Sequence, residues 1–129
     1  MQQHLADKNI ALDLVRVTEA AALAAARFFG RGDKEAADEA AVEAMRIAFQ
    51  GIHIRGTVVI GEGEKDHAPM LYNGEKVGFG DGPEMDVAVD PVDGTTAVAF
   101  GYNNSLAVVG LAQKGCMFNP GPSYYCKKL

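Results

Sequence analysis

Two long stretches with helical hydrophobic spacing, at about residues 8–29 and 34–50, come before any β-branched run in this chain. In both, apolar side chains recur at three- and four-residue intervals, the pattern of a helix that buries one face. Asp33 is the expected N-cap of the second helix, and Gly30 and Gly51 mark the two helix ends. The expected apolar positions are Leu12, Val15, Ala22 and Ala26, then Ala37, Ala41, Met45 and Ala48.

The remaining chain carries short strand signals joined by polar loops. Strands are expected at 57–60, 86–89 and 105–113, a hairpin at Asn73-Gly74, a short helix at 97–100 and a turn at Lys114-Gly115. Two helices must pack their apolar faces on another layer, and these strands supply it. The strands and helices do not alternate regularly enough for a doubly wound parallel sheet. We therefore expect an α/β fold of the layered α+β kind, with a mixed sheet and flanking helices.

Composition excludes several classes of function. The net charge is -5 over 129 residues, with no basic stripe, so nucleic acid is not an expected partner. The most apolar stretch, near residues 20–29, is too short to span a bilayer, so no membrane partner is expected either. Cys116 and Cys126 lack metal-ligand spacing, and reduced thiols fit a cytoplasmic protein.

Acidic residues gather in the middle of the chain. Only Lys65 and Lys76 oppose nine acids there: Glu62, Glu64, Asp66, Glu75, Asp81, Glu84, Asp86, Asp90 and Asp93. One interpretation is a solvated acidic face. The other is a cation site, because closely packed carboxylates repel one another and a divalent cation relieves that repulsion.

The segment "DVAVDPVDGTT" favours the cation site. Asp90 ends an apolar strand, Pro91 should prevent the strand from continuing, and Asp93 returns to the same space. The backbone N–H groups of Gly94 and Thr95 follow, and they could bind an anion if a helix starts there. Two carboxylates beside such amides suit a metal-dependent phosphate site. The alternative is an Asx turn that uses Asp93 and Gly94 simply to end the strand.

A second acidic loop, "GEGEKD", also follows an apolar strand, and Glu62 is its first acid. Two strand ends that deliver carboxylates to one place can hold a pair of hard cations through oxygen ligands. Neither this loop nor "GFGDG" has the spacing of a nucleotide-binding loop. We therefore expect a two-metal site rather than a nucleotide site.

These residues carry a family resemblance. "DPVDGTT" resembles the motif of the lithium-sensitive, metal-dependent phosphomonoesterases, which include inositol monophosphatases and fructose-1,6-bisphosphatases. "GRGDKEAADEAAVEAMR", "VVIGEGEKDHAPMLYNGEKVG" and the run from Asp86 to Gly115 resemble the class II, bacterial-type fructose-1,6-bisphosphatases. In cyanobacteria that class also hydrolyses sedoheptulose 1,7-bisphosphate. The resemblance extends from about Leu14 to Leu129.

The resemblance implies roles for individual residues. Asp38 and Glu62 would bind one metal ion, and Asp90 and Asp93 the second, with Mn2+ or Mg2+ as the cofactor. Without the resemblance, Asp38 would pass for a solvated helix residue. The expected catalytic residues are Lys34, Asp66, Asp93 and Thr95, of which Thr95 would position the attacking water, and the expected substrate-binding residues are Asp93, Gly94, Thr95 and Tyr125.

Two features depart from the family pattern. The segment "NPGPSYYCKKL" is one residue longer than the family pattern that it resembles, so counting back from the end makes Tyr125 the expected substrate tyrosine, with Tyr124 as the alternative. Family members also continue into a second α/β portion that supplies another metal ligand and most of the sugar contacts. The resemblance therefore implies that residues 1–129 are an N-terminal metal- and phosphate-binding portion, with the second portion absent.

The function implied is hydrolysis of the 1-phosphate of fructose 1,6-bisphosphate, in gluconeogenesis or the Calvin cycle. A small sugar bisphosphate is the expected partner, and the complete protein is expected to form a homo-oligomer, as is common in the family. One alternative is a phosphatase of the same superfamily that acts on inositol or nucleotide monophosphates. Another is a truncated metal-binding fragment without turnover.

Overall fold

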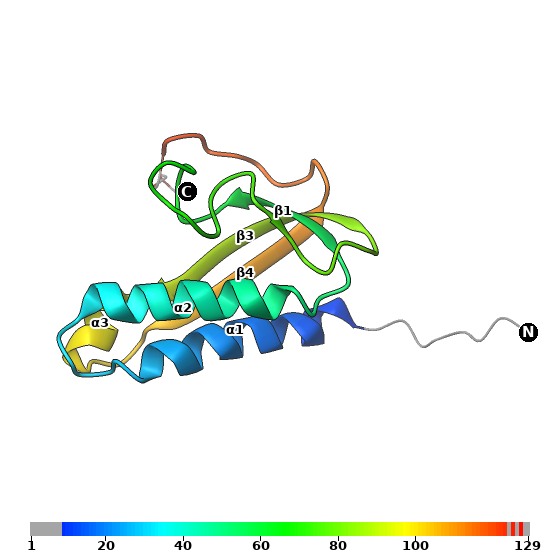
Figure 1. Cartoon of the computed structure of the whole chain (residues 1–129). Helices are drawn as coiled ribbons and strands as arrows, with labels where there is room; N and C mark the ends of the chain where they lie inside the picture. Colours follow the sequence, from blue (N-terminus) through cyan, green and yellow to red (C-terminus); the bar gives the residue numbers. More distant parts are fainter. Residues whose placement is uncertain (1–8, 124, 126, 128–129) are drawn as a thin grey trace, which may run out of the picture.

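The computed structural model of the chain describes residues 9–123, 125 and 127. The elements follow the order expected, with helices first and strands after them. They are α1 (Ile10–Ala26), α2 (Lys34–Phe49), β1 (Arg55–Ile60), β2 (Lys76–Val77), β3 (Glu84–Asp93), α3 (Thr95–Phe100) and β4 (Leu106–Gln113). Figure 1 shows α1 and α2 side by side along one side of the sheet, and α3 at one end.

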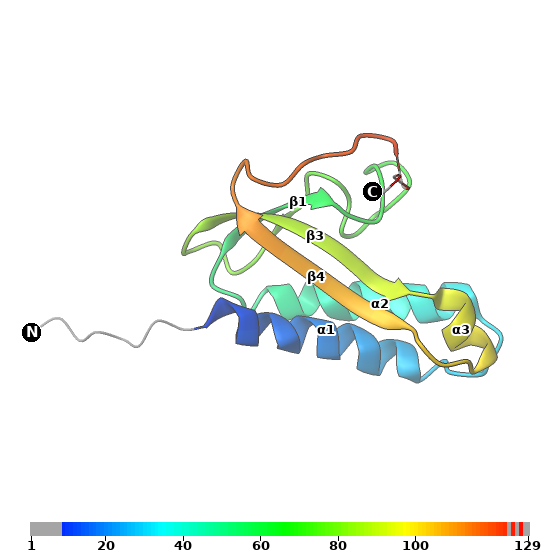
Figure 2. The same ribbon diagram turned by 180° about the vertical axis from the view of Figure 1, so that it is seen from behind.

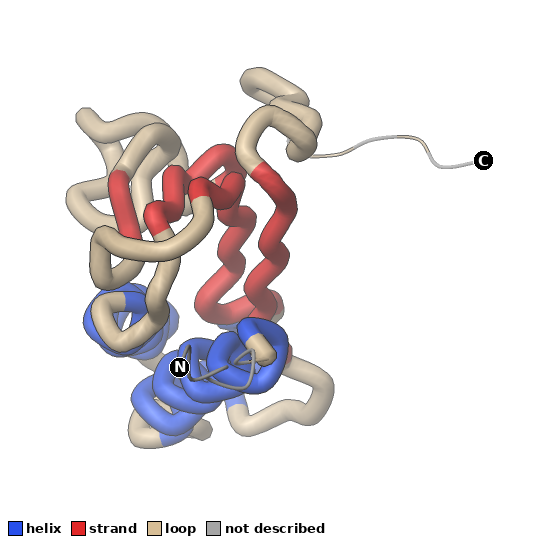
Figure 3. Tube along the Cα trace, turned by 90° about the vertical axis from the view of Figure 1, so that its right-hand side faces the viewer, coloured by secondary structure: helices blue, strands red, loops and turns tan. Residues whose placement is uncertain are grey.

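The sheet has the order β2-β1-β3-β4. β1 and β3 are parallel, whereas β2 pairs with β1, and β4 with β3, in antiparallel fashion. The view from behind and the side view show one layer of strands and one layer of the two long helices (Figures 2 and 3). The predicted fold class, a layered α+β arrangement with a mixed sheet, is confirmed.

Both long helices begin with the cap that their sequence predicts or allows. The Asp33 side chain accepts a hydrogen bond from the Ala36 backbone N–H at 3.0 Å, as expected for the N-cap of α2. The Asn9 side chain plays the same part for α1 through the Ala11 N–H. These caps fix where the helices start, and in α2 the start decides where Asp38 lies.

The buried face of α1 differs from the predicted one. Leu12 and Val15 are 68% and 45% exposed, and the helix instead buries Val17, Ala21 and Ala25. Alanine is abundant all round this helix, so periodicity alone could not select the stripe. The prediction for α2 was better, because Ala37, Ala41 and Met45 are buried.

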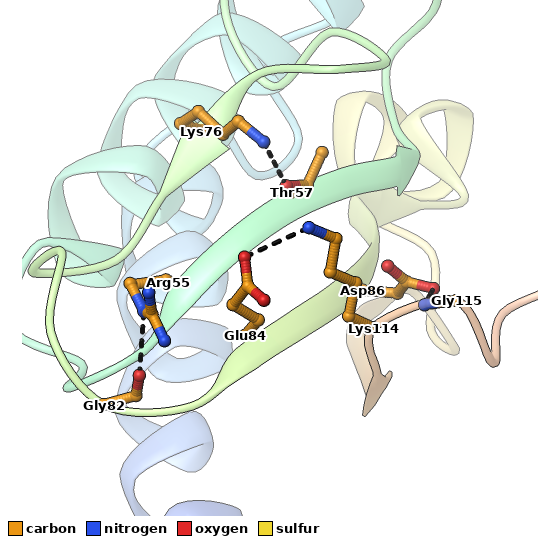
Figure 4. Close-up of polar contacts among 8 residues, drawn as sticks. All are labelled: Arg55, Thr57, Lys76, Gly82, Glu84, Asp86, Lys114 and Gly115. Atoms are coloured by element: carbon orange, nitrogen blue, oxygen red, sulfur yellow. Dashed lines mark hydrogen bonds and ion pairs between the residues drawn. The ribbon is translucent and has the colours of Figure 1, made fainter.

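The core lies between the helices and the near face of the sheet. Its largest fully buried side chains are Phe49, Met45, Ile54, Leu71, Val17, Val58, Val87 and Pro91. The opposite face of the sheet carries charged side chains instead (Figure 4). There the Lys114 ammonium, 3.1 Å from the Glu84 carboxylate, holds the pKa of Glu84 below its usual value, and Arg55 and Lys76 add to the effect.

Two local predictions were wrong. Lys76 and Val77 form a strand, but it pairs with β1 at Thr57 and Gly56, not with residues 71–72 across the Asn-Gly turn. Pro91 does not end its strand either, because β3 runs on to Asp93 through an irregularity in its pairing with β4. Proline is compatible with a strand at such a bulge, since no ladder N–H is needed there.

Among residues 9–123, 125 and 127, no helix has the length and apolar character needed to cross a membrane.

Candidate metal and phosphate site

A bulge in β3 brings Asp90 and Asp93 to the same side of the sheet. Asp90 pairs with Val108 and Asp93 pairs with Leu106, so two residues, Pro91 and Val92, stand opposite one residue of β4. In a regular strand, residues three apart point to opposite faces. The extra residue reverses that rule, so Pro91 and Val92 are both buried while both aspartates are exposed.

Asp38 and Glu62 meet from two other elements. Asp38 projects from the second turn of α2, and Glu62 begins the loop that follows β1. Both line a hollow of about 300 Å³, together with Val42, His67, Met70 and three other residues. The structure therefore brings the helix carboxylate and the strand-end carboxylate to one hollow.

The pKa shifts show that these acids are electrostatic neighbours. Burial first, and then the charges of the Asp38 and Asp90 carboxylates, together raise the pKa of Glu62 to about 7. Partial burial also raises the pKa of Asp90, followed by the charges of Asp93 and Asp38, while a hydrogen bond from the Val92 backbone opposes the rise. The four predicted ligands thus form one acidic cluster: Asp38, Glu62, Asp90 and Asp93.

The cluster is loose. Within the described part of the chain, no three Asp, Glu, His or Cys side chains are gathered tightly enough to hold one metal ion. The donor set is nonetheless of one chemical kind, since carboxylate oxygens are the ligands that Mg2+ and Mn2+ prefer. Four neighbouring carboxylates fit a divalent cation better than they fit an anion alone.

A short helix begins directly after Asp93. Gly94, at φ +93°, is the N-cap of α3, and the first N–H groups of any helix lack partners within it. The Gly94 carbonyl accepts a hydrogen bond from the Ser105 hydroxyl at 2.8 Å, which ties the loop to the start of β4. The Gly30 and Gly32 N–H groups donate to the Val98 and Ala99 carbonyls at 2.8 and 2.7 Å, so the turn between α1 and α2 holds α3 in place.

The other predicted site residues are exposed or partly exposed. Thr95 is the first residue of α3 and is partly exposed. Lys34 is the exposed first residue of α2, one turn before Asp38. Asp66 is exposed in the same loop as Glu62. Tyr125 is 96% exposed, so its side chain does not pack on the cluster, and Tyr124 lies outside the described residues.

Several of the nine central acids serve the fold instead. Asp86 is buried and accepts hydrogen bonds from the Gly115 and Met117 N–H groups at 2.8 and 3.2 Å (Figure 4 shows the first pair). Asp81 contacts His53 at 2.9 Å, and Glu84 pairs with Lys114. Sequence alone could not separate these acids from the cluster, because their roles depend on partners distant in the chain.

The raised pKa of Glu62 predicts how stability depends on pH without divalent cations. Its folded pKa of about 7 lies above its usual 4.5, so folding disfavours the ionised form. Stability should therefore fall as the pH rises from about 4.5 to 7, and stay low above that. In EDTA, we expect a lower unfolding temperature at pH 8 than at pH 5, measured by circular dichroism.

The matched variants make this test specific. Glu62→Gln should reduce the fall in unfolding temperature between pH 5 and pH 8, because it removes the group that must ionise. Glu43→Gln, an exposed change on α2, should leave the slope as it is. Equal slopes in the parent chain and Glu62→Gln would show that Glu62 is not the titrating group.

Comparison with known proteins places this geometry in a family. The sequence model described as bacterial fructose-1,6-bisphosphatase, glpX-encoded, matches residues 8–129. The chain is 54% identical over 122 residues to fructose-1,6-bisphosphatase 1 class 2 of Escherichia coli K12, and equally to class 2 enzymes of Escherichia coli O6:H1 and Shigella flexneri. Each match covers 95% of this chain but 36% of the relative, so the chain spans about a third of the relatives' length. It belongs to the bacterial, glpX-encoded fructose-1,6-bisphosphatase family.

Proposed function

We propose that this chain is the N-terminal metal- and phosphate-binding portion of a cytoplasmic fructose-1,6-bisphosphatase. The observation that carries the proposal is that Asp38 and Glu62, from two separate elements, line one hollow, and that the charges of Asp38 and of Asp90 from β3 both raise the pKa of Glu62. Asp93 lies three residues after Asp90, and the backbone N–H groups of Gly94 and Thr95 come directly after it. A second α/β portion, as the family resemblance implies, would complete the sugar contacts and the homo-oligomer.

In this proposal, Asp38 and Glu62 hold one divalent cation, and Asp90 and Asp93 hold the other. Mn2+ and Mg2+ both suit carboxylate oxygens. Such ions lower the pKa of an attacking water and neutralise charge on the phosphate oxygens. The chain's own residues do the positioning: the N–H groups of Gly94 and Thr95 face a phosphate oxygen, and the Thr95 hydroxyl orients the water. Lys34 and Asp66 stay in the proposal as polar residues near the reacting groups, and Tyr125 as a sugar contact.

The substrate proposed is fructose 1,6-bisphosphate, which loses its 1-phosphate to give fructose 6-phosphate. This rests on the names of relatives that are 54% identical. The test is phosphate release by the native protein, isolated from its source cells at whatever length it has there, with Mn2+ or Mg2+ supplied in turn. Fructose 1,6-bisphosphate should be hydrolysed faster than sedoheptulose 1,7-bisphosphate, inositol monophosphates or nucleotide monophosphates. Preference for a monophosphate would overturn the proposed substrate. Mn2+ binding without any phosphate release would indicate a metal-binding fragment.

Thr95→Ala should lower turnover more than it weakens metal binding. The hydroxyl is proposed to orient the water, and loss of one positioned hydrogen-bonding group typically costs about 100-fold in rate. Steady-state kinetics over a Mn2+ titration would separate the two effects. Thr96→Ala, one residue further along α3, is the matched control. An unchanged rate at saturating Mn2+, with only weaker affinity, would remove Thr95 from the role with the water.

A further inference from the structure

Glu75 is a buried carboxylate that the proposed chemistry does not use. Its side chain is 6% exposed, and both of its oxygens accept hydrogen bonds. One bond comes from the Arg46 guanidinium of α2 at 2.7 Å, and the other from the Leu71 backbone N–H. A carboxylate is rarely buried unless it is paired in this way. The question is what this pairing secures.

The buried Glu75 carboxylate holds Leu71, a residue with a strained backbone, through a hydrogen bond. Leu71 is fully buried and adopts φ +53°, a left-handed conformation that is uncommon for a bulky side chain. Such conformations persist only where the surroundings fix them, and they gather at functional sites. Both backbone groups of Leu71 are engaged: its N–H donates to Glu75, and its carbonyl accepts from the Glu62 N–H at 2.9 Å.

These contacts form a continuous path between two proposed metal ligands. Arg46 and Asp38 lie on the same helix, two turns apart. From Arg46 the path runs through the Glu75 carboxylate and the Leu71 backbone to the Glu62 N–H. Glu75 is itself anchored to β1, because its carbonyl accepts from the Val58 N–H at 2.9 Å. The loop that carries Glu62 is thereby fastened both to the sheet and to the helix that carries Asp38.

We infer that Glu75 is a positioning residue that fixes Glu62 opposite Asp38. This inference rests on the proposed function, which makes Glu62 and Asp38 ligands of one cation. Glu75 does not touch that cation; it acts through Leu71. Partners that orient metal ligands commonly affect metal affinity about 10- to 100-fold when they are lost.

The deciding variant is Glu75→Gln in the native-length protein. Glutamine has nearly the same shape, but its amide offers only one acceptor oxygen, so it cannot serve both Arg46 and Leu71. We expect the dissociation constant for Mn2+, measured by titration calorimetry, to rise about tenfold or more. We also expect the Glu62 amide to exchange its hydrogen faster by about the same factor, since its acceptor is less well fixed.

Controls separate positioning from general stability. Val17→Ala weakens the core under α1 without touching the loop, and it should leave Mn2+ affinity unchanged. Arg46→Gln keeps a donor toward Glu75 and should give a smaller loss of affinity than Glu75→Gln. If Glu75→Gln fails to fold by circular dichroism, the Arg46→Gln result alone decides, with any loss of more than about twofold as support.

The outcomes distinguish this inference from the proposed function. If the parent chain binds Mn2+ and folded Glu75→Gln binds it equally well, the positioning role is overturned and the proposed function stands. An equal loss in Val17→Ala would also overturn the role, because it would show a general effect of stability. If the parent chain shows no saturable Mn2+ binding, the metal site and the positioning role both fail.

Discussion

Asp90→Asn is expected to abolish metal-dependent phosphate release from fructose 1,6-bisphosphate, a loss of about 100-fold or more in turnover. Asp90 is coupled by charge to the other three acids, since it raises the pKa of Glu62 while Asp93 and Asp38 raise its own pKa. Asparagine keeps the shape but removes the charge that a cation needs. Phosphate release by the native-length protein, with and without the substitution, would measure the loss.

A matched control exists in the same acidic segment. Asp81→Asn removes an equal charge from a residue that contacts His53 at 2.9 Å on the protein surface. It should leave phosphate release within about twofold of the parent, as is usual for surface changes. Retention of most activity in Asp90→Asn would remove Asp90 from the site, and an equal loss in Asp81→Asn would point to overall charge instead.

Gly61→Ala is expected to disrupt the loop that carries Glu62. A Cβ at this position would collide with the Leu71 carbonyl oxygen and lie 2.6 Å from Val58 Cγ1. The first obstacle is backbone, and the strained Leu71 cannot move without releasing Glu62. We expect a loss of about 3 kcal/mol in unfolding free energy, which is a large part of the roughly 5–15 kcal/mol typical of a domain. Urea unfolding followed by circular dichroism would measure it.

Gly51→Ala is the control for that substitution. Its Cβ would meet only the Ala48 carbonyl oxygen, at 3.6 Å, which is an ordinary contact. Its unfolding free energy should stay within about 0.5 kcal/mol of the parent value. If Gly61→Ala proved equally harmless, the close packing of Gly61 against Leu71 would be wrong, and the route by which the loop fixes Glu62 would be wrong with it.

The sequence predicted the elements well and their contacts less well. The N-cap and end of α2 and the strand at 105–113 follow from local signals, because capping and β-branching act over a few residues. The buried stripe of α1 and the partner of β2 do not, since both depend on residues distant in the chain. The bulge at Pro91 is the most instructive case. Proline indicated a strand end, but the structure uses it to turn Asp90 and Asp93 to one side.

The sequence offered the candidate ligands but not the residues that support them. Asp90, Asp93 and Glu62 follow apolar strands, a pattern visible in the chain, whereas Asp38 was found only through the family resemblance. Glu75, Leu71 and Ser105 were missed as supporting residues. A left-handed Leu has no sequence signature, and Glu75 looks like any acid near an Asn-Gly turn until Arg46 is placed beside it.

The central claim is that Asp38, Glu62, Asp90 and Asp93 bind divalent cations. The most direct test is a calorimetric titration of the native-length protein with Mn2+ near pH 7.5, which is above the pKa of about 7 of Glu62. We predict saturable binding that Asp90→Asn weakens by about tenfold or more and that Asp81→Asn does not change. Binding that is absent, or that is the same in all three proteins, would contradict the claim.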